Sequence, residues 1–321
     1  KKLVKSYNKK FKKVKWKKIS CVCGSNNSFK IYNKDRHGII NPVCVCLNCG
    51  TLRANPIPPD EVTNKFYSQN LYQKIYSPLD IEAHFKERIK VRKNIKDSIF
   101  LKHTEPFLNK GKLSKILEIG CGGGWNLYVF RQAGYSNLVG YEPGSITRNI
   151  GVRELGLDLR DGFIDDALES GEKYDLIILN HVIEHLIDPI NVLKKLKNLL
   201  TDEGILYLGL PNIQSLLHRQ IQNAHFWYFS PLFFIKLVIG SGYLICDYGR
   251  QGKHFYCISI KNKYNFKTSM FNNLIKNERN IILAKIIPSL FLDIVDKAFL
   301  SFKNLMRLFK KNLKNKFFKD I

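Results

Sequence analysis

Three residues near the middle of this sequence combine the side-chain types that proton transfer requires. His181, Glu184 and His185 are spaced i, i+3 and i+4, so one helical turn would place them on a common face. An imidazole ordinarily has a pKa of about 6.5, so it can remove a proton from a hydroxyl group at neutral pH. We therefore consider His181, His185 and Glu184 as candidates for general-base catalysis. Alternatively, Glu184 and His185 only brace the helix.

The cysteines near the start of the chain form a second candidate site. Cys46-x-x-Cys49-Gly is a knuckle of the kind that binds zinc, and Cys21 and Cys23 provide a less regular first half with C-x-C spacing. We expect Cys21, Cys23, Cys46 and Cys49 to bind a structural Zn²⁺ ion, with Cys44 as a substitute ligand. The alternative is a metal-free hairpin with small buried cysteines. The scarcity of large aliphatic residues here favours zinc, because so small a core needs a staple.

A glycine-rich turn marks the scaffold that must position these residues. The aliphatic run over 116–119 is typical of a buried parallel strand, and it ends at glycines 120, 122, 123 and 124, before a helical pattern. Strand, turn and helix form the opening of a nucleotide-binding α/β unit. The dinucleotide pattern G-x-G-x-x-G fails at Trp125, and the Gly-Lys-Ser/Thr of a phosphate-binding loop is absent.

Further strands follow at distances that fit one parallel sheet. Residues 138–141 precede Glu142, whose carboxylate can accept hydrogen bonds from two ribose hydroxyls; the alternative is an exposed glutamate without a role. The apolar run over 175–179 predicts a central strand that ends in polar residues, at the edge of the sheet where ligands bind. Residues 201–204 are predicted to form a turn before a strand over 205–212.

Together these segments resemble the class I S-adenosylmethionine-dependent methyltransferases. Residues 118–124, E-I-G-C-G-G-G, are similar to their E/D-x-G-x-G-x-G motif. Residues 181–189, H-V-I-E-H-L-I-D-P, are similar to the H-V-L-E-H-L-x-D-P motif of a subgroup that methylates cell-surface glycans and small molecules. The resemblance implies an α/β fold with a seven-stranded, mostly parallel Rossmann-like sheet. It also implies S-adenosylmethionine as cofactor, bound by Glu118, Gly120, Cys121, Gly122, Gly124, Glu142, Pro143, Asp161 and Asn180.

The resemblance also concerns the acceptor and a second metal. Residues 225–231 are similar to the H-x-x-x-F-[ST]-P loop of the subgroup, which makes His225 and Tyr228 substrate-side candidates; the alternative is an aromatic loop packed on the core. Ubiquinone-biosynthesis O-methyltransferases have an E-x-x-E-H stretch that is associated with a divalent cation. His181, Glu184 and His185 are therefore candidate ligands at the active site, although His181 replaces the first Glu.

The net charge of +25 is concentrated at the ends, since the first eighteen residues hold ten lysines and no acid. These ends are either solubilising, disordered tails or segments that attract an anionic surface. Tyr67, Tyr72 and Tyr76 form either a substrate mouth or part of the core. We expect a basic tail at 1–18, a zinc-ribbon-like module at 19–55, a helical connector or lid at 56–110, a methyltransferase domain at 111–262 and a basic amphipathic helical tail at 263–321.

The expected function is methylation of a sugar hydroxyl in a nucleotide- or lipid-linked glycan, in bacterial cell-surface polysaccharide biosynthesis. The alternatives are an RNA or protein methyltransferase and a non-catalytic scaffold. Nucleic acid is not expected as a partner, because no aromatic residues alternate with the basic runs. No apolar run follows the first lysines, so we expect a cytoplasmic protein, and the C-terminal helix suggests a peripheral position at the inner membrane face. The oligomeric state is not indicated.

Overall fold

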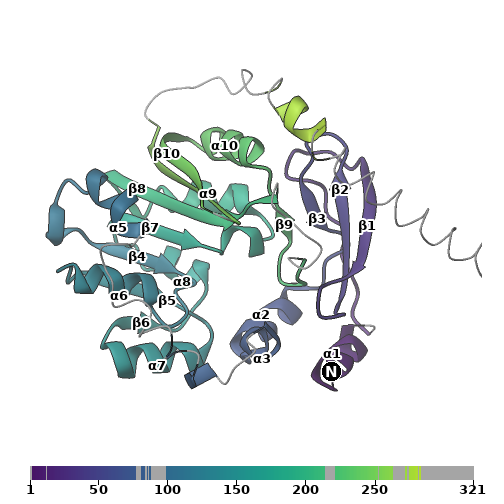
Figure 1. The fold of residues 1–321 in the computed structure, drawn as a ribbon, viewed down its shortest axis with the longest axis horizontal. Coiled ribbons are helices and arrows are strands. Elements are labelled where there is room, and N and C mark those ends of the chain that lie inside the picture. Colours follow the sequence, from purple (N-terminus) through teal and green to yellow (C-terminus); the bar gives the residue numbers. More distant parts are fainter. Residues whose placement is uncertain are drawn as a thin grey trace, which may run out of the picture.

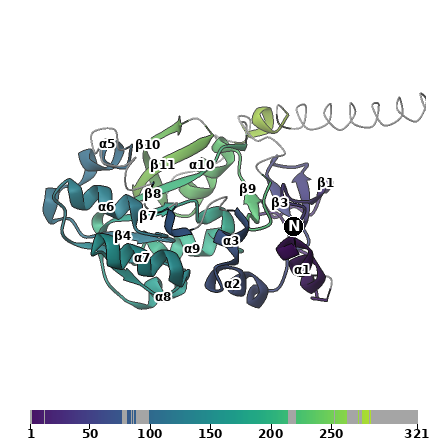
Figure 2. The same ribbon diagram turned by 60° about the horizontal axis from the view of Figure 1, so that its bottom comes forward.

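Two β-sheets carry the fold, and Figures 1 and 2 show them side by side. The structure is a computed structural model that describes residues 2–11, 13–76, 81–83, 85, 87, 99–213, 221–251, 253–262, 272, 275–280 and 282. Most of the amphipathic tail expected at 263–321 lies outside the described residues. Among the described helices, none is long and apolar enough to cross a membrane.

The elements alternate between strand and helix through the middle of the chain. The helices are α1 (Lys2–Phe11), α2 (Asp60–Ser68), α3 (Leu71–Tyr76), α5 (Ile99–Thr104), α6 (Trp125–Gln132), α7 (Ser145–Leu155), α8 (Ile164–Glu169), α9 (Pro189–Leu196) and α10 (Pro231–Gly240). Short 3₁₀ helices are η2 (Glu105–Phe107), η3 (Gly111–Leu113) and η4 (Ile183–His185). The strands are β1 (Ser28–Lys34), β2 (Ile40–Cys46), β3 (Leu52–Ala54), β4 (Ile116–Ile119), β5 (Leu138–Tyr141), β6 (Asp158–Arg160), β7 (Tyr174–Asn180), β8 (Leu200–Pro211), β9 (Trp227–Tyr228), β10 (Tyr243–Gln251) and β11 (His254–Lys261).

The larger sheet of the described chain has seven strands in the order β10-β11-β8-β7-β4-β5-β6. Its strands from β8 to β6 run parallel, whereas β11 and β10 are antiparallel to their neighbours. Aliphatic runs buried on both faces favour parallel strands. The expected seven-stranded, mostly parallel α/β fold is therefore confirmed. Residues 201–204, predicted as a turn, lie within β8, but the pairing with β7 passes from Leu200↔Tyr174 directly to Ile205↔Leu176, so they form a bulge in the strand instead of a separate turn.

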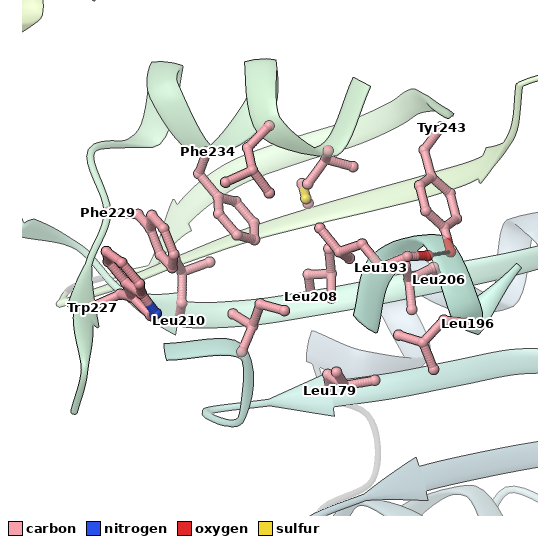
Figure 3. Packing of buried hydrophobic residues seen from close by; sticks show 14 of the residues in the cluster. Leu179, Leu193, Leu196, Leu206, Leu208, Leu210, Trp227, Phe229, Phe234 and Tyr243 are labelled. Carbon is pink, nitrogen blue, oxygen red and sulfur yellow. Dashed lines mark hydrogen bonds between the residues drawn. The ribbon is translucent and has the colours of Figure 1, made fainter. Parts of the chain in front are cut away.

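Successive side chains of the central strands β4, β7 and β8 enter two different hydrophobic clusters, one on each face of the sheet. In β4, Leu117 and Ile119 belong to one cluster and Ile116 to the other, as the alternation along a strand requires. Helices α6 and α7 supply residues to the Ile116 cluster, and α8, α9 and α10 supply residues to the Leu117 cluster. Figure 3 shows part of the Leu117 cluster, in which the Tyr243 hydroxyl donates to the Leu193 carbonyl at 2.8 Å.

The smaller sheet joins two distant parts of the chain. Its order is β1-β2-β3-β9, and all its pairs are antiparallel. Strand β9 follows His225 in sequence, yet it pairs with β3 through Leu52↔Tyr228 and Arg53↔Trp227 (Figure 1). The cysteine module and the segment after His225 are therefore parts of one sheet.

The lysine-rich start forms a packed helix. Tyr7 and Phe11 of α1 are buried, and the rings of Tyr7 and Phe66 of α2 are 5.2 Å apart. The lysines of α1 occupy other positions of the helix, so its apolar stripe can pack on the protein. For residues 2–11, the interpretation as a disordered tail is therefore wrong.

Candidate active site

The carboxyl ends of the parallel strands open onto a cavity of about 1220 Å³. The part of the lining that the large sheet and its loops contribute is called the sheet side. The sheet side includes Glu118, Gly120, Cys121, Gly122, Asn126, Glu142, Pro143, Gly162, Phe163, Asn180, His181, His185 and His254. We call lid side the lining contributed by residues 36–85 and 222–226. The lid side includes Arg36, Asp60, Asn64, Tyr67, Tyr72, Gln73, Tyr76, Phe85, Gln222 and Phe226.

The turn between β4 and α6 has room only for glycine at key positions. Gly120 has φ +67°, a left-handed conformation, and a Cβ atom there would lie 2.6 Å from Val182 Cγ2. A Cβ atom on Gly123 would lie 2.3 Å from Phe85 Cε2. Glycine at these positions therefore allows Val182 and Phe85 to pack against the backbone of the turn, which lines the cavity.

Two acids border this turn. The Glu118 carboxylate is buried and accepts a hydrogen bond of 2.5 Å from the Asn126 amide. Glu142, at the end of β5, accepts hydrogen bonds from the Gly122 N–H at 2.9 Å and the Gly144 N–H at 2.8 Å. Burial raises the pKa of the Glu142 carboxyl, and the two N–H groups act in the opposite direction. Asn126 was missed in the sequence; its only signal was an amide in an otherwise apolar helix start.

Asp161 has a partner outside the cavity. Its carboxylate pairs with Arg148 Nη1 at 2.8 Å and is 74% exposed. Arg148 also donates to the Glu142 carbonyl, at 2.6 Å. In this structure Gly162, Phe163 and Ile164, rather than Asp161, line the cavity. The predicted contact between Asp161 and the cofactor stays a prediction.

His181 is held at the tip of β7 in a left-handed backbone conformation, with φ 59°. The backbone N–H of His181 donates to the Gly209 carbonyl at 2.8 Å. The ring atom Nδ1 lies 3.2 Å from Glu184 Oε1. The imidazole is about one-third exposed and lines the cavity. Glu184, by contrast, is 1% exposed and lies behind the lining. A buried carboxylate thus orients an accessible imidazole.

Glu184 is also the centre of a histidine cluster. His185 Nε2 and His225 Nε2 lie 4.0 Å and 3.9 Å from its Oε1. Burial alone would raise the pKa of Glu184, but the hydrogen bond from His181 and the electrostatic effect of the neighbouring imidazoles lower it to about 2. Glu184 is therefore an anion at neutral pH.

The two inner histidines are buried and neutral. Burial lowers the pKa of both, and the Glu184 charge opposes this effect. His185 Nδ1 lies 2.8 Å from the Ala224 carbonyl and 2.7 Å from the Tyr67 hydroxyl. Because a carbonyl only accepts, the contact with Ala224 places a proton on Nδ1. Glu184, His185 and His225 lie close enough together to hold a divalent ion, with His225 instead of the predicted His181 as third ligand.

Two predicted substrate-side residues are buried. His225 is 3% and Tyr228 1% exposed, and neither is among the described residues that line the cavity. The Tyr228 hydroxyl donates to the Gln222 carbonyl at 3.1 Å. Direct contact of either residue with a substrate stays a prediction. The sequence analysis missed His254, whose ring lies 4.7 Å from that of His181.

The three connector tyrosines line the cavity and pack on one another. Tyr67 stacks on Tyr72 with centroids 5.7 Å apart, and Tyr72 lies 5.1 Å from Tyr76. Gln73, Asn64 and Gln222 add amide groups to the same lid side. Both interpretations of the tyrosines are therefore partly correct, since each ring is partly buried and also borders the cavity.

The four expected cysteines lie together in the module. Their Sγ atoms are within 4.8 Å of one another, with Cys21–Cys49 and Cys23–Cys46 both at 3.6 Å. A tetrahedral ion with Zn–S bonds of about 2.3 Å places two sulfurs about 3.8 Å apart, so the thiols fit Zn²⁺. The hydrogen bond with Cys21 lowers the pKa of Cys46 to about 6. Cys44 lies outside the cluster and donates to the Asn55 carbonyl.

Comparison with known proteins agrees with this geometry. Residues 91–242 match a family model described as a methyltransferase domain. Together with the sheet order, the match supports a class I S-adenosylmethionine-dependent methyltransferase. In this class the cofactor is S-adenosylmethionine.

Curated relatives match only the central part of the chain. A tRNA U34 carboxymethyltransferase from Campylobacter hominis is 33% identical over 32% of this chain and 38% of its own length. A ubiquinone biosynthesis O-methyltransferase from Actinobacillus pleuropneumoniae is 31% identical over 30% of this chain and 46% of its own length. The chain thus spans less than half of each relative. A solved methyltransferase from Archaeoglobus fulgidus is 15% identical, with a TM-score of 0.45, over 57% of this chain and all of its own.

Proposed function

We propose that the protein transfers a methyl group from S-adenosylmethionine to a sugar hydroxyl of a nucleotide- or lipid-linked glycan. The observation that carries the proposal is that residues suited to bind the cofactor and a residue suited to act as a general base line one cavity. The glycine turn with Glu142 fits the cofactor, and the accessible His181, backed by Glu184, fits a general base.

On the cofactor side, Glu142 is the residue that would bind the ribose. A carboxylate at the end of the second strand accepts hydrogen bonds from two hydroxyls. The Gly122 and Gly144 N–H groups keep it in place. Glu118 and Asn126 line the same cavity and would bind polar groups of the cofactor's amino-acid part.

On the acceptor side, the residues of the chain align the hydroxyl and take its proton. When bound, S-adenosylmethionine supplies an electrophilic methyl group. Alignment of the acceptor oxygen with that group contributes most of the rate. His181 would accept the proton of the acceptor hydroxyl, and the Glu184 carboxylate would stabilise the imidazolium that forms.

The lid side supports a sugar as acceptor. Aromatic faces of Tyr67, Tyr72 and Tyr76 suit the apolar faces of a sugar ring, and the amides of Asn64 and Gln73 suit its hydroxyls. The cysteine module, which contributes Arg36 to the lid side, would hold a structural Zn²⁺ ion in its four-thiol cluster.

An RNA methyltransferase is the second candidate, favoured by the name of the Campylobacter relative and by the net charge of +25. Against it, the described lining contains the exposed carboxylates Asp60, Asp165, Asp166 and Asp188. These acids would repel a phosphate backbone that crosses the cavity.

Two measurements test the proposal. S-adenosylhomocysteine should bind the purified chain, and Glu142→Gln should weaken binding by about 10-fold or more, because a charged acceptor is lost. Glu154→Gln, an exposed acid on α7, is the matched control and should bind normally. Labelled S-adenosylmethionine should then transfer its methyl group to the sugar or glycolipid fraction of a cell extract. Label found only in RNA or protein would overturn the sugar acceptor.

A further inference from the structure

The N-terminal module reaches the cavity through the tip of its β1–β2 hairpin. Arg36, at this tip, lines the lid side. Its backbone N–H donates to the Ile221 carbonyl at 3.0 Å, and the Asn41 amide donates to the Gln222 carbonyl at 3.1 Å. The hairpin is thereby attached to the loop that carries Gln222, a second residue of the lid side.

A buried carboxylate fixes the conformation of this tip. Asp35 is 4% exposed and accepts hydrogen bonds from the N–H groups of His37 and Ile39, both at 2.8 Å. Its second oxygen accepts from the Tyr76 hydroxyl at 2.7 Å and the Asn223 N–H at 3.2 Å. Four donors from three segments therefore meet at Asp35. Because both oxygens of Asp35 are hydrogen-bonded, the turn at the tip of the hairpin is held rigid.

The side chain of Arg36 is presented on an aromatic surface. Its guanidinium lies 5.1 Å from the centre of the Tyr76 ring, and its Nε contacts His37 Nε2 at 3.1 Å. A guanidinium held against a ring keeps its planar donors oriented for a phosphate or carboxylate.

We propose that Arg36 binds a phosphate group of the acceptor, and that Asp35 is the positioning residue that holds Arg36 at the cavity. The inference rests on the proposed function and names its acceptor as a phosphorylated sugar. A cavity of about 1220 Å³ exceeds the roughly 300–1,000 Å³ of a single-ligand pocket, so cofactor and acceptor can be bound together. Asp60 also lines the lid side, so the phosphate must lie nearer Arg36 than Asp60.

The test is calorimetric titration of the full chain, saturated with S-adenosylhomocysteine, with inorganic pyrophosphate, uridine diphosphate and geranyl diphosphate. Arg36→Ala should weaken diphosphate binding by about 10- to 100-fold, because charge-assisted hydrogen bonds are lost. Arg36→Lys should be intermediate. Lys34→Ala removes a charge from the same hairpin outside the lining and should have no effect. Tighter binding of uridine diphosphate indicates a nucleotide carrier, and tighter binding of geranyl diphosphate a lipid carrier.

The readouts separate this inference from the proposed function. If S-adenosylhomocysteine does not bind, the proposed function fails. If it binds, but the diphosphates do not bind or bind Arg36→Ala as tightly as the natural chain, the phosphate site is disproved. Asp35→Asn should weaken diphosphate binding while S-adenosylhomocysteine affinity is kept. If Asp35→Asn does not fold, Arg36→Ala alone decides.

Discussion

Glu184 determines the chemistry of the histidine cluster. Its carboxylate is buried, yet three imidazoles face one of its oxygens within 4.0 Å. An isolated buried carboxylate would take up a proton, whereas one that accepts a hydrogen bond from His181 and lies beside two further imidazoles stays ionised. The pair His181–Glu184 therefore combines an accessible base with a fixed counter-charge. Because Glu184 is ionised, the stability of the protein should depend on pH.

Glu184→Gln should change how stability depends on pH. The pKa of Glu184 is lowered to about 2 in the folded chain, so its stabilisation is complete above the ordinary pKa of about 4.5 and disappears as the pH falls to about 2. Urea unfolding should show the natural chain exceeding Glu184→Gln by on the order of 3 kcal/mol at pH 6 and by much less near pH 3. The exposed Glu61→Gln should show no such trend. A difference independent of pH would refute an ionised Glu184.

At the scale of elements, the glycine turn is shaped by the helix that packs on it. Helix α7 packs directly on it, and a Cβ atom on Gly151 would lie 2.5 Å from the Gly123 carbonyl oxygen. Backbone atoms cannot move aside as a side chain can. The turn therefore owes its position to close contact with a helix that follows it in sequence.

Gly151→Ala should destabilise the protein although alanine is the better helix former by about 1 kcal/mol. The clash with Gly123 should outweigh that gain and also weaken S-adenosylhomocysteine binding, because the turn must move. Gly240→Ala is the matched control at the end of α10, where the added Cβ would have no atom within 4 Å apart from its chain neighbours and its own helix. It should leave binding unchanged and stability unchanged or slightly higher. Thermal unfolding measures the stability of each variant, and calorimetry measures its affinity for S-adenosylhomocysteine. Equal effects of the two substitutions would contradict the packing argument.

At the scale of the molecule, the cysteine module is continuous with the active site. Strand β3 follows the Cys46–Cys49 knuckle and pairs with β9. The Phe226 N–H just before β9 donates to the Glu184 carbonyl at 2.9 Å, and the Trp227 indole donates to the Leu186 carbonyl at 2.8 Å. One short strand thus separates the thiols from the histidine cluster.

Zinc analysis of the purified chain should find one ion. Cys46→Ser should lose it and lower the unfolding midpoint by about 10 °C or more, because metal binding contributes to folding. Cys44→Ser should keep both the ion and the midpoint, because Cys44 lies outside the cluster and serine can still donate to Asn55. No zinc in the natural chain, or equal effects of the two changes, would refute the zinc site.

The sequence by itself determined the α/β sheet, the glycine turn and the strand ends that carry Glu142, Asn180 and His181. These features follow from local rules: aliphatic runs form parallel strands, glycines permit left-handed turns, and carboxyl ends of parallel strands share one edge. The four cysteines were recognised from spacing alone, and the structure brings them together.

Only the tertiary structure decided which distant side chains meet. Arg36 at the cavity, His225 beside Glu184, the pairing of β9 with β3 and the ion pair of Asp161 with Arg148 join segments whose separation has no periodic signal. The burial of Tyr228 likewise depends on packing by the module. Such contacts are selected by the free energy of burying whole surfaces against each other, and no local pattern records that choice.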